Sequence, residues 1–126
     1  EMLSDEERNL FCEYAIIANE ITYKRYISEI LPGIKMADSK FLTELEKNYA
    51  FSFDADRVIR EAVFDKPTLF LCGRQDVCVG YKDLQKLIDD YSRASFVVLD
   101  SAGHNLQIEQ SSLFQELVKN WLKRTD

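Results

Sequence analysis

The sequence predicts an α/β protein in which a helical segment precedes a β-α-β-α unit. Apolar residues recur at helical spacing through most of residues 1–65. After Pro67, two short apolar runs, "TLFLCG" (68–73) and "SFVVLD" (95–100), have the length and composition of buried strands. A helical pattern follows each run. Two parts are therefore expected, a helical segment over residues 1–65 and a β-α-β-α segment over residues 66–126.

A long helix is expected at the start of the chain. Ser4 is followed three positions later by Glu7, the capping-box pattern that marks a helix start. Apolar residues then recur at helical spacing as far as Ile30. The tripeptide "LPG" (31–33) is expected to end this helix, because proline disfavours a helical residue before it and glycine favours a turn. Tyr14, on the apolar side of the helix, is expected to pack in the core.

Three shorter elements complete the helical segment. Asp38 is expected to cap a second helix that carries Phe41 and Leu45 on its apolar side. The run "YAFSF" (49–53) alternates aromatic and small residues, which indicates an extended stretch. "DADRVIREAV" (54–63) is expected to form a short helix or a turn.

The second segment is expected to contain two helices beside its two strands. "YKDLQKLIDDY" (81–91) predicts a helix between the strands, and residues 109–124 predict a final helix with an apolar stripe. A helix that connects two strands of one sheet makes the strands parallel, with a right-handed crossover. The apolar stripe of the final helix consists of Leu113, Phe114, Leu117, Val118, Trp121 and Leu122.

The composition excludes several classes of partner. The chain has 126 residues, 46% of them hydrophobic, and a net charge of −6. Residues 1–65 hold 14 of the 22 acidic residues and 8 of the 16 basic ones, so the charge imbalance lies in the helical segment. Because an acidic surface repels phosphates, neither nucleic acid nor an anionic membrane is an expected partner. The apolar runs are too short to cross a bilayer.

The cysteines predict a reducing compartment. The sequence shows no signal-peptide pattern, and because it opens with Glu1 we expect it to begin partway along a longer chain. An odd number of cysteines without such a signal predicts a cytoplasmic protein. Cys72 is expected to pack inside a strand, and Cys78 lies in a loop where a nucleophilic role is not favoured. Without a C-x-x-C motif, and with a single histidine, neither a metal nor a cofactor is expected.

Asp76 and His104 occupy matching positions after the two predicted strands. Asp76 ends "GRQD" (73–76), and His104 ends "DSAGH" (100–104). Parallel strands lie about 5 Å apart, or about 10 Å with one strand between them, and their carboxyl ends share one edge of the sheet. The carboxylate can then reach the imidazole Nδ1 and leave Nε2 free to accept a proton. The alternative, that each is an ordinary loop residue, remains open on spacing alone.

Two stretches, "PTLFLCGRQDVCVGY" and "SFVVLDSAGHNLQIEQSSLFQELVKNWL", resemble the C-terminal part of the α/β-hydrolase superfamily. The resemblance covers residues 66–124, from the acid loop to the terminal helix. It implies that Asp76 is the acid of a catalytic triad and that His104 is its base. Residues 1–65 resemble the helical cap that many members insert before these last two core strands. The implied fold is an incomplete α/β-hydrolase: a cap followed by part of the parallel sheet.

The sequence departs from the family pattern at the nucleophile. The family places its serine in a G-x-S-x-G turn before the acid. The glycines here stand at positions 33, 73, 80 and 103, so no two are four residues apart. No serine is assigned as nucleophile, and the oxyanion-hole residues are not identified either. The chain by itself is therefore expected to be inactive on activated esters. The serines before Asp76 are Ser4, Ser28, Ser39 and Ser52.

Three functions are compatible with these features. The first is the C-terminal fragment of a cap-bearing hydrolase that cleaves an ester or amide bond of a small molecule by a Ser-Asp-His triad. The second is a non-catalytic binding module derived from the same fold. The third is an independent small α/β domain that is not related to the hydrolases, so that the resemblance is misleading. Because a two-stranded sheet is marginal and its edges recruit other strands, self-association or pairing with the missing N-terminal half is expected.

Overall fold

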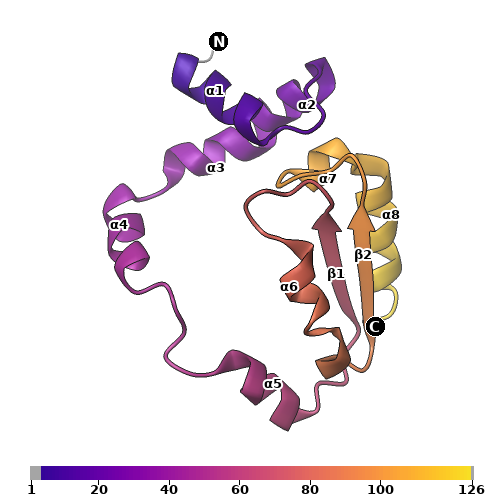
Figure 1. Ribbon diagram of the computed structural model, residues 1–126. Coiled ribbons are helices and arrows are strands. Elements are labelled where there is room, and N and C mark those ends of the chain that lie inside the picture. Colours follow the sequence, from indigo (N-terminus) through magenta and orange to yellow (C-terminus); the bar gives the residue numbers. More distant parts are fainter. Residues whose placement is uncertain (1–3, 126) are drawn as a thin grey trace.

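A two-stranded parallel sheet forms the centre of the second segment in the computed structural model, which describes residues 4–125 (Figure 1). β1 (Thr68–Gly73) pairs with β2 (Ala94–Leu99), with Thr68 opposite Ala94 and Gly73 opposite Leu99. Both predicted strands and their parallel pairing are confirmed. Because the strands end level with each other, the loops that follow them leave from the same edge of the sheet.

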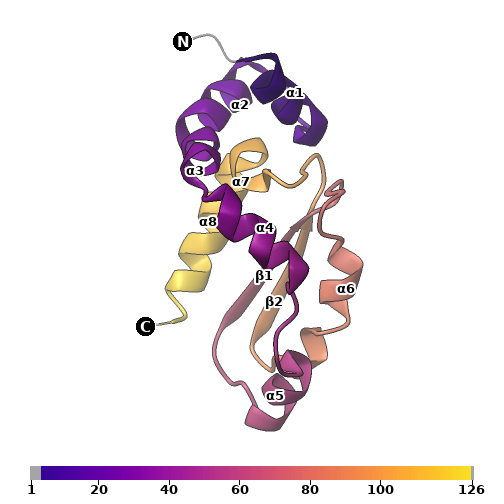
Figure 2. The same ribbon diagram turned by 90° about the vertical axis from the view of Figure 1, so that its left-hand side faces the viewer.

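Helices cover the two faces of this sheet. α6 (Tyr81–Gln85) lies on one face and α8 (Ser111–Leu122) on the other (Figures 1 and 2). The helix expected over residues 81–91 is shorter, because its second half tightens into the 3₁₀ turn η2 (Ile88–Asp90). This turn brings the Tyr91 ring to 5.0 Å from the Phe70 ring, between centroids.

The final helix also differs from the expectation at its start. A short helix, α7 (Leu106–Glu109), precedes α8. Gln110 separates the two, because its backbone angles of φ −117° and ψ 47° lie outside the helical range. The Trp121 indole N–H donates a hydrogen bond of 2.8 Å to the carbonyl of Pro67 and so fixes α8 to the start of β1.

The predicted long N-terminal helix is wrong in its length. α1 (Asp5–Tyr14) begins with the predicted capping box: the Glu7 N–H donates to the Ser4 hydroxyl, and the Ser4 N–H donates to the Glu7 carboxylate. It ends at Tyr14, and an irregular stretch follows. The Asn19 side chain then caps α2 (Glu20–Arg25) by accepting two backbone N–H bonds. The chain therefore turns at residues 15–19, where helical spacing alone predicts a continuous helix.

The "LPG" tripeptide does not end the helix as expected. α2 continues through a π-helical turn, η1 (Tyr26–Ile30), into α3 (Leu31–Met36). The Leu31 N–H donates to the carbonyl of Tyr26, five residues back. Pro32 then lies at the start of α3, directly after the π-helical turn. The helical winding therefore changes immediately before the proline.

α4 (Ser39–Lys47) and α5 (Ala55–Ala62) form an arm that leaves the other helices and returns to β1 (Figure 1). Asp38 caps α4, as predicted, by accepting hydrogen bonds from two backbone N–H groups. The stretch over residues 49–53, expected to be extended, forms no strand, since neither β1 nor β2 pairs with it. Its Phe51 and Phe53 rings stack on each other in solvent, 5.5 Å apart.

Buried apolar side chains join the helical segment to the second segment. Phe11 packs with its ring 5.3 Å from the ring of Tyr23 and 5.3 Å from that of Tyr26. Leu31 and Ile108 complete this cluster, so α7 is packed into it from the far end of the chain. The contact holds α1 to α3 above the carboxyl ends of the strands (Figure 1). Over residues 4–125, every helix is too short or too polar to span a bilayer.

Candidate active site

The loop after β1 holds the Asp76 carboxylate in a fixed orientation. One oxygen, Oδ1, accepts hydrogen bonds from the backbone N–H groups of Cys78 (2.8 Å) and Val79 (3.0 Å). Such a turn around an aspartate is a local consequence of its short side chain. Partial burial by itself raises the pKa of the Asp76 carboxyl, but these two hydrogen bonds, together with His104, outweigh burial and lower it. Asp76 is therefore ionised at neutral pH.

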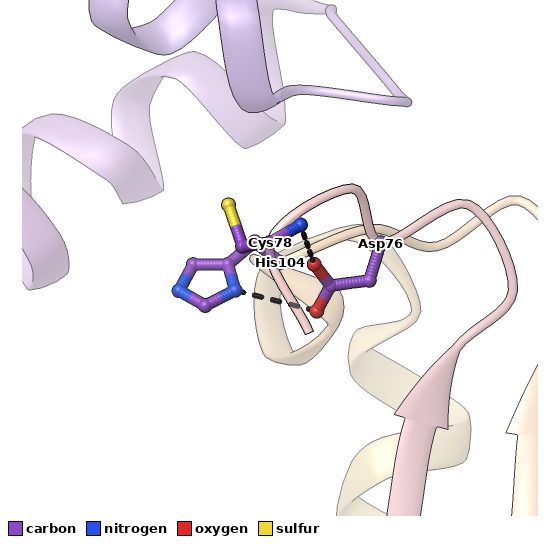
Figure 3. Close-up of side chains that lie close together, drawn as sticks. All are labelled: Asp76, Cys78 and His104. Atoms are coloured by element: carbon purple, nitrogen blue, oxygen red, sulfur yellow. Dashed lines mark hydrogen bonds and ion pairs between the residues drawn. The ribbon is translucent and has the colours of Figure 1, made fainter. Parts of the chain in front are cut away.

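His104 meets the other oxygen of this carboxylate. Its Nδ1 lies 3.3 Å from Asp76 Oδ2 (Figure 3). The second ring nitrogen points away from Asp76, and half of the His104 side chain is exposed, against 10% for Asp76. When Nδ1 carries the proton and donates it to the carboxylate, Nε2 keeps a lone pair that can accept a proton. In this geometry the carboxylate orients the imidazole ring and leaves Nε2 free to accept a proton.

The loops after the two strands are bound tightly to each other. The Gln75 N–H donates to the carbonyl of Ala102 at 2.9 Å, and the Ala102 N–H donates to the Gln75 side chain at 3.2 Å. The Gln75 amide also donates to Asp100 at 2.7 Å. Gly73 has no room for a side chain, because a Cβ would meet the carbonyl oxygens of Ala102 and Gly103. This close packing sets the distance between Asp76 and His104.

Glu109, in α7, is a residue of this site that sequence analysis did not identify. Its buried carboxylate accepts hydrogen bonds from the N–H groups of Gly103 (2.6 Å), Ile16 (2.6 Å) and Ile17 (3.2 Å). A buried carboxylate needs such partners, and hydrogen bonds to an ionised group are among the stronger ones. The sequence offers one signal, an acidic residue five positions after His104, and this signal alone does not indicate that Glu109 belongs to the site. Glu109 thus joins the turn between α1 and α2 to the histidine loop.

A cavity of about 440 Å³ opens beside His104, beneath the N-terminal helices. Tyr14 lines this cavity, with its ring centroid 6.3 Å from that of His104. The expectation that Tyr14 packs in the core is wrong, since α1 ends at this residue and turns it towards the site. The lining is mostly apolar and comes from α1, η1 and α3, from the two loops and from α7. It consists of Leu10, Tyr14, Tyr26, Ile30, Ile34, Cys78, His104, Asn105 and Gln107.

No serine is among the described residues that line the cavity. Ser4 caps α1, and the Ser28 hydroxyl donates to the carbonyl of Lys24 within its own helix. Ser39 begins α4, and Ser52 lies in the exposed stretch between α4 and α5. Asp76 and His104 are therefore brought together on this chain, whereas none of these serines lines the cavity beside them.

Comparisons with known proteins agree with the fold. No protein-family model matches the sequence, and no curated protein matches it. A solved structure, the crystal structure of an alpha/beta superfamily hydrolase from Oenococcus oeni PSU-1, is similar over 99% of this chain, with a TM-score of 0.88 and 27% sequence identity. The chain spans 46% of that structure, a little under half of its length. The predicted resemblance to part of an α/β-hydrolase is confirmed at the level of fold.

Proposed function

Because the chain has the fold of the C-terminal portion of an α/β-superfamily hydrolase, we propose that it supplies the acid and base of a hydrolytic site. Asp76 is the acid and His104 the base, and the bond cleaved is an ester or amide of a small molecule. The observation that carries the proposal is the 3.3 Å contact between Asp76 Oδ2 and His104 Nδ1 at the edge of a cavity. The nucleophile, a serine hydroxyl, comes from another stretch of polypeptide.

The chemistry follows from the orientation of the imidazole. His104 Nε2 takes the proton of the attacking hydroxyl, and the nearby Asp76 carboxylate stabilises the imidazolium that forms. His104 then gives this proton to the leaving alcohol or amine. The acyl group is then bonded to the oxygen of the nucleophile. In a second cycle, water gives a proton to His104 and attacks this acyl group, so that the carboxylic acid product is released and the nucleophile regains its proton from His104. Asp76 keeps its negative charge throughout, in agreement with its lowered pKa.

The N-terminal helices are proposed to act as a cap that selects the substrate. Leu10, Ile30 and Ile34 give the cavity an apolar wall, opposite the polar loops that carry His104. Such a wall favours a substrate with an apolar group next to the scissile bond. Because Glu109 joins the cap turn to the histidine loop, the position of the cap is coupled to that of the base.

The sheet is proposed to pair with further polypeptide. Both strands are edges of the described sheet, and Thr68 to Leu71 of β1 are only half-buried. Unpaired strand edges recruit other strands. The partner is the N-terminal half of a hydrolase or a second copy of this chain. Sedimentation at tens of micromolar tests this proposal, with the chain alone and with an added N-terminal half. Association of the chain alone indicates a second copy, and association only in the mixture indicates the N-terminal half. A chain that stays monomeric in both samples contradicts the proposal.

A reducing location such as the cytoplasm is also proposed. The three cysteines are all free thiols, and Cys12 and Cys78 are exposed. Exposed thiols persist where glutathione and thioredoxin keep them reduced. Recovery of the protein from cells with either thiol in a disulfide would contradict this location.

A chimaera tests the proposed function. The part of the Oenococcus oeni hydrolase that this chain does not cover is fused before residue 1, since the family pattern places the nucleophile there. The chain alone is expected to leave p-nitrophenyl acetate unhydrolysed, and the folded chimaera is expected to hydrolyse it. His104→Ala should remove the activity. A folded chimaera that is no faster than the chain alone would favour the alternative function, a non-catalytic binding module.

A further inference from the structure

We propose that Asp76, Cys78 and His104 form a binding site for a zinc-like divalent cation. One ligand atom from each side chain, an oxygen, a sulfur and a nitrogen, lies within 4.8 Å of the other two. The residues come from the two loops that follow β1 and β2 (Figure 3). The site shares Asp76 and His104 with the proposed hydrolytic role. Cation binding is a separate function, because the cation takes the place of the Nδ1 proton through which His104 contacts Asp76.

The separation of the two ligand atoms from Asp76 and His104 suits a tetrahedral metal. Zinc binds imidazole nitrogen and carboxylate oxygen at about 2.0–2.2 Å, so two such atoms at a tetrahedral angle lie about 3.3–3.5 Å apart. His104 Nδ1 and Asp76 Oδ2 are 3.3 Å apart. Asp76 Oδ1 is held by the N–H groups of Cys78 and Val79, which fixes the carboxylate and leaves Oδ2 facing the imidazole. Such outer hydrogen bonds orient metal ligands.

Cys78 supplies the third ligand. A zinc–sulfur bond of about 2.3 Å places the sulfur about 3.5 Å from the other two ligand atoms. The present separation of up to 4.8 Å is closed by a shift of about 1 Å, within reach of a χ1 rotation. Cys78 is exposed, so no packed neighbour opposes this rotation. Its thiol gives its proton to solvent on binding, and the Nδ1 proton of neutral His104 moves to Nε2.

The donor set selects the class of cation. A thiolate and an imidazole favour zinc and cadmium, whereas magnesium and calcium prefer oxygen ligands alone. Three protein ligands leave the fourth tetrahedral position for water, at the edge of the cavity. If the proposed function holds, a bound cation also breaks the contact between Asp76 and His104, and zinc inhibits hydrolysis.

The test is a cadmium titration of the chain itself, read from the ultraviolet sulfur-to-cadmium charge-transfer band, with zinc binding measured by calorimetry. One equivalent is expected to bind. Cys78→Ser should abolish the band, and Asp76→Asn and His104→Ala should each weaken zinc binding by more than about 10-fold. Cys12→Ser, which alters an exposed thiol outside the cluster, is the matched control and should leave binding unchanged.

Several results would overturn the site. These are a wild-type chain without the band at saturating cadmium, a Cys78→Ser variant that binds as tightly as wild type, and a Cys12→Ser variant that loses the band. Far-ultraviolet circular dichroism of each variant shows that a lost affinity is not lost folding. Because this test uses the chain alone and the hydrolytic role is tested in the chimaera, each proposal can fail while the other stands.

Discussion

The Glu109 carboxylate accepts a 2.6 Å hydrogen bond from the N–H of Gly103, the residue before His104. The same carboxylate binds the N–H groups of Ile16 and Ile17, more than 90 positions away in the chain. One buried side chain therefore binds both the stretch that follows the first helix and the loop that carries the histidine. Through these three hydrogen bonds, Glu109 connects the helical segment to the loop of the site.

Glu109→Gln is expected to lower the free energy of unfolding by about 2–4 kcal/mol, because the new amide N–H₂ faces at least one buried donor that then loses its partner. Hydrogen exchange at the N–H groups of Ile16, Ile17 and Gly103 should become faster. Glu116→Gln makes the same chemical change on the exposed side of α8 and should leave stability unchanged. Equal stabilities of the two variants in urea unfolding would show that the Glu109 bonds contribute nothing.

A glycine substitution tests the contact between the two loops. Gly73→Ala is expected to destabilise the fold by about 1–3 kcal/mol, because the added Cβ meets the backbone carbonyls of Ala102 and Gly103. Gly80→Ala is the matched control, since no atom lies within 4 Å of a Cβ there. Urea unfolding measures both. A Gly73→Ala variant as stable as Gly80→Ala would mean that the loops are not pressed together.

The lowered pKa of Asp76 predicts how stability depends on pH. Burial raises this pKa, and the bonds from Val79, Cys78 and His104 outweigh it, so the folded value lies below the usual 3.8. A carboxyl with a lowered pKa stabilises the fold above its unfolded pKa, and this contribution is lost as the pH falls through the folded pKa. The stability of wild type should therefore fall more steeply below pH 3.8 than that of Asp76→Asn. Parallel curves of unfolding free energy against pH would contradict the shift.

The three thiols are expected to react at different rates. Burial raises the pKa of the Cys72 thiol, and the charge of Asp76 raises it further, so little reactive thiolate forms there. Cys12 and Cys78 are exposed. A chromogenic disulfide reagent at neutral pH should label two thiols quickly and the third only after unfolding. Fast labelling of three thiols in the folded chain would place Cys72 at the surface.

The elements that the sequence predicts correctly depend on local patterns. The strands over Thr68–Gly73 and Ala94–Leu99 are short apolar runs between turns, and the caps at Ser4 and Asp38 act within three residues. The proximity of Asp76 to His104 could be predicted because two neighbouring parallel strands end at one edge. That prediction needs the order of the elements and no detail of packing.

The elements that the sequence does not reveal depend on contacts between distant residues. The end of α1 at Tyr14 is stabilised by Glu109, and helical spacing carries no sign of such a partner. The helix continues past Pro32 directly after a π-helical turn, and local propensity does not predict such a turn. Tyr14 lines the cavity because its helix ends there, so the error about its position follows from the error about the helix.

A double-mutant cycle in the chimaera tests most directly whether Asp76 acts on the reaction through His104. His104→Ala, Asp76→Asn and the double variant are compared by their kcat/KM for p-nitrophenyl acetate. We predict a loss of about 10³-fold for His104→Ala and no further loss in the double variant, because groups that act as a unit are not additive. Losses that multiply in the double variant, or a His104→Ala chimaera as active as its parent, would contradict the account.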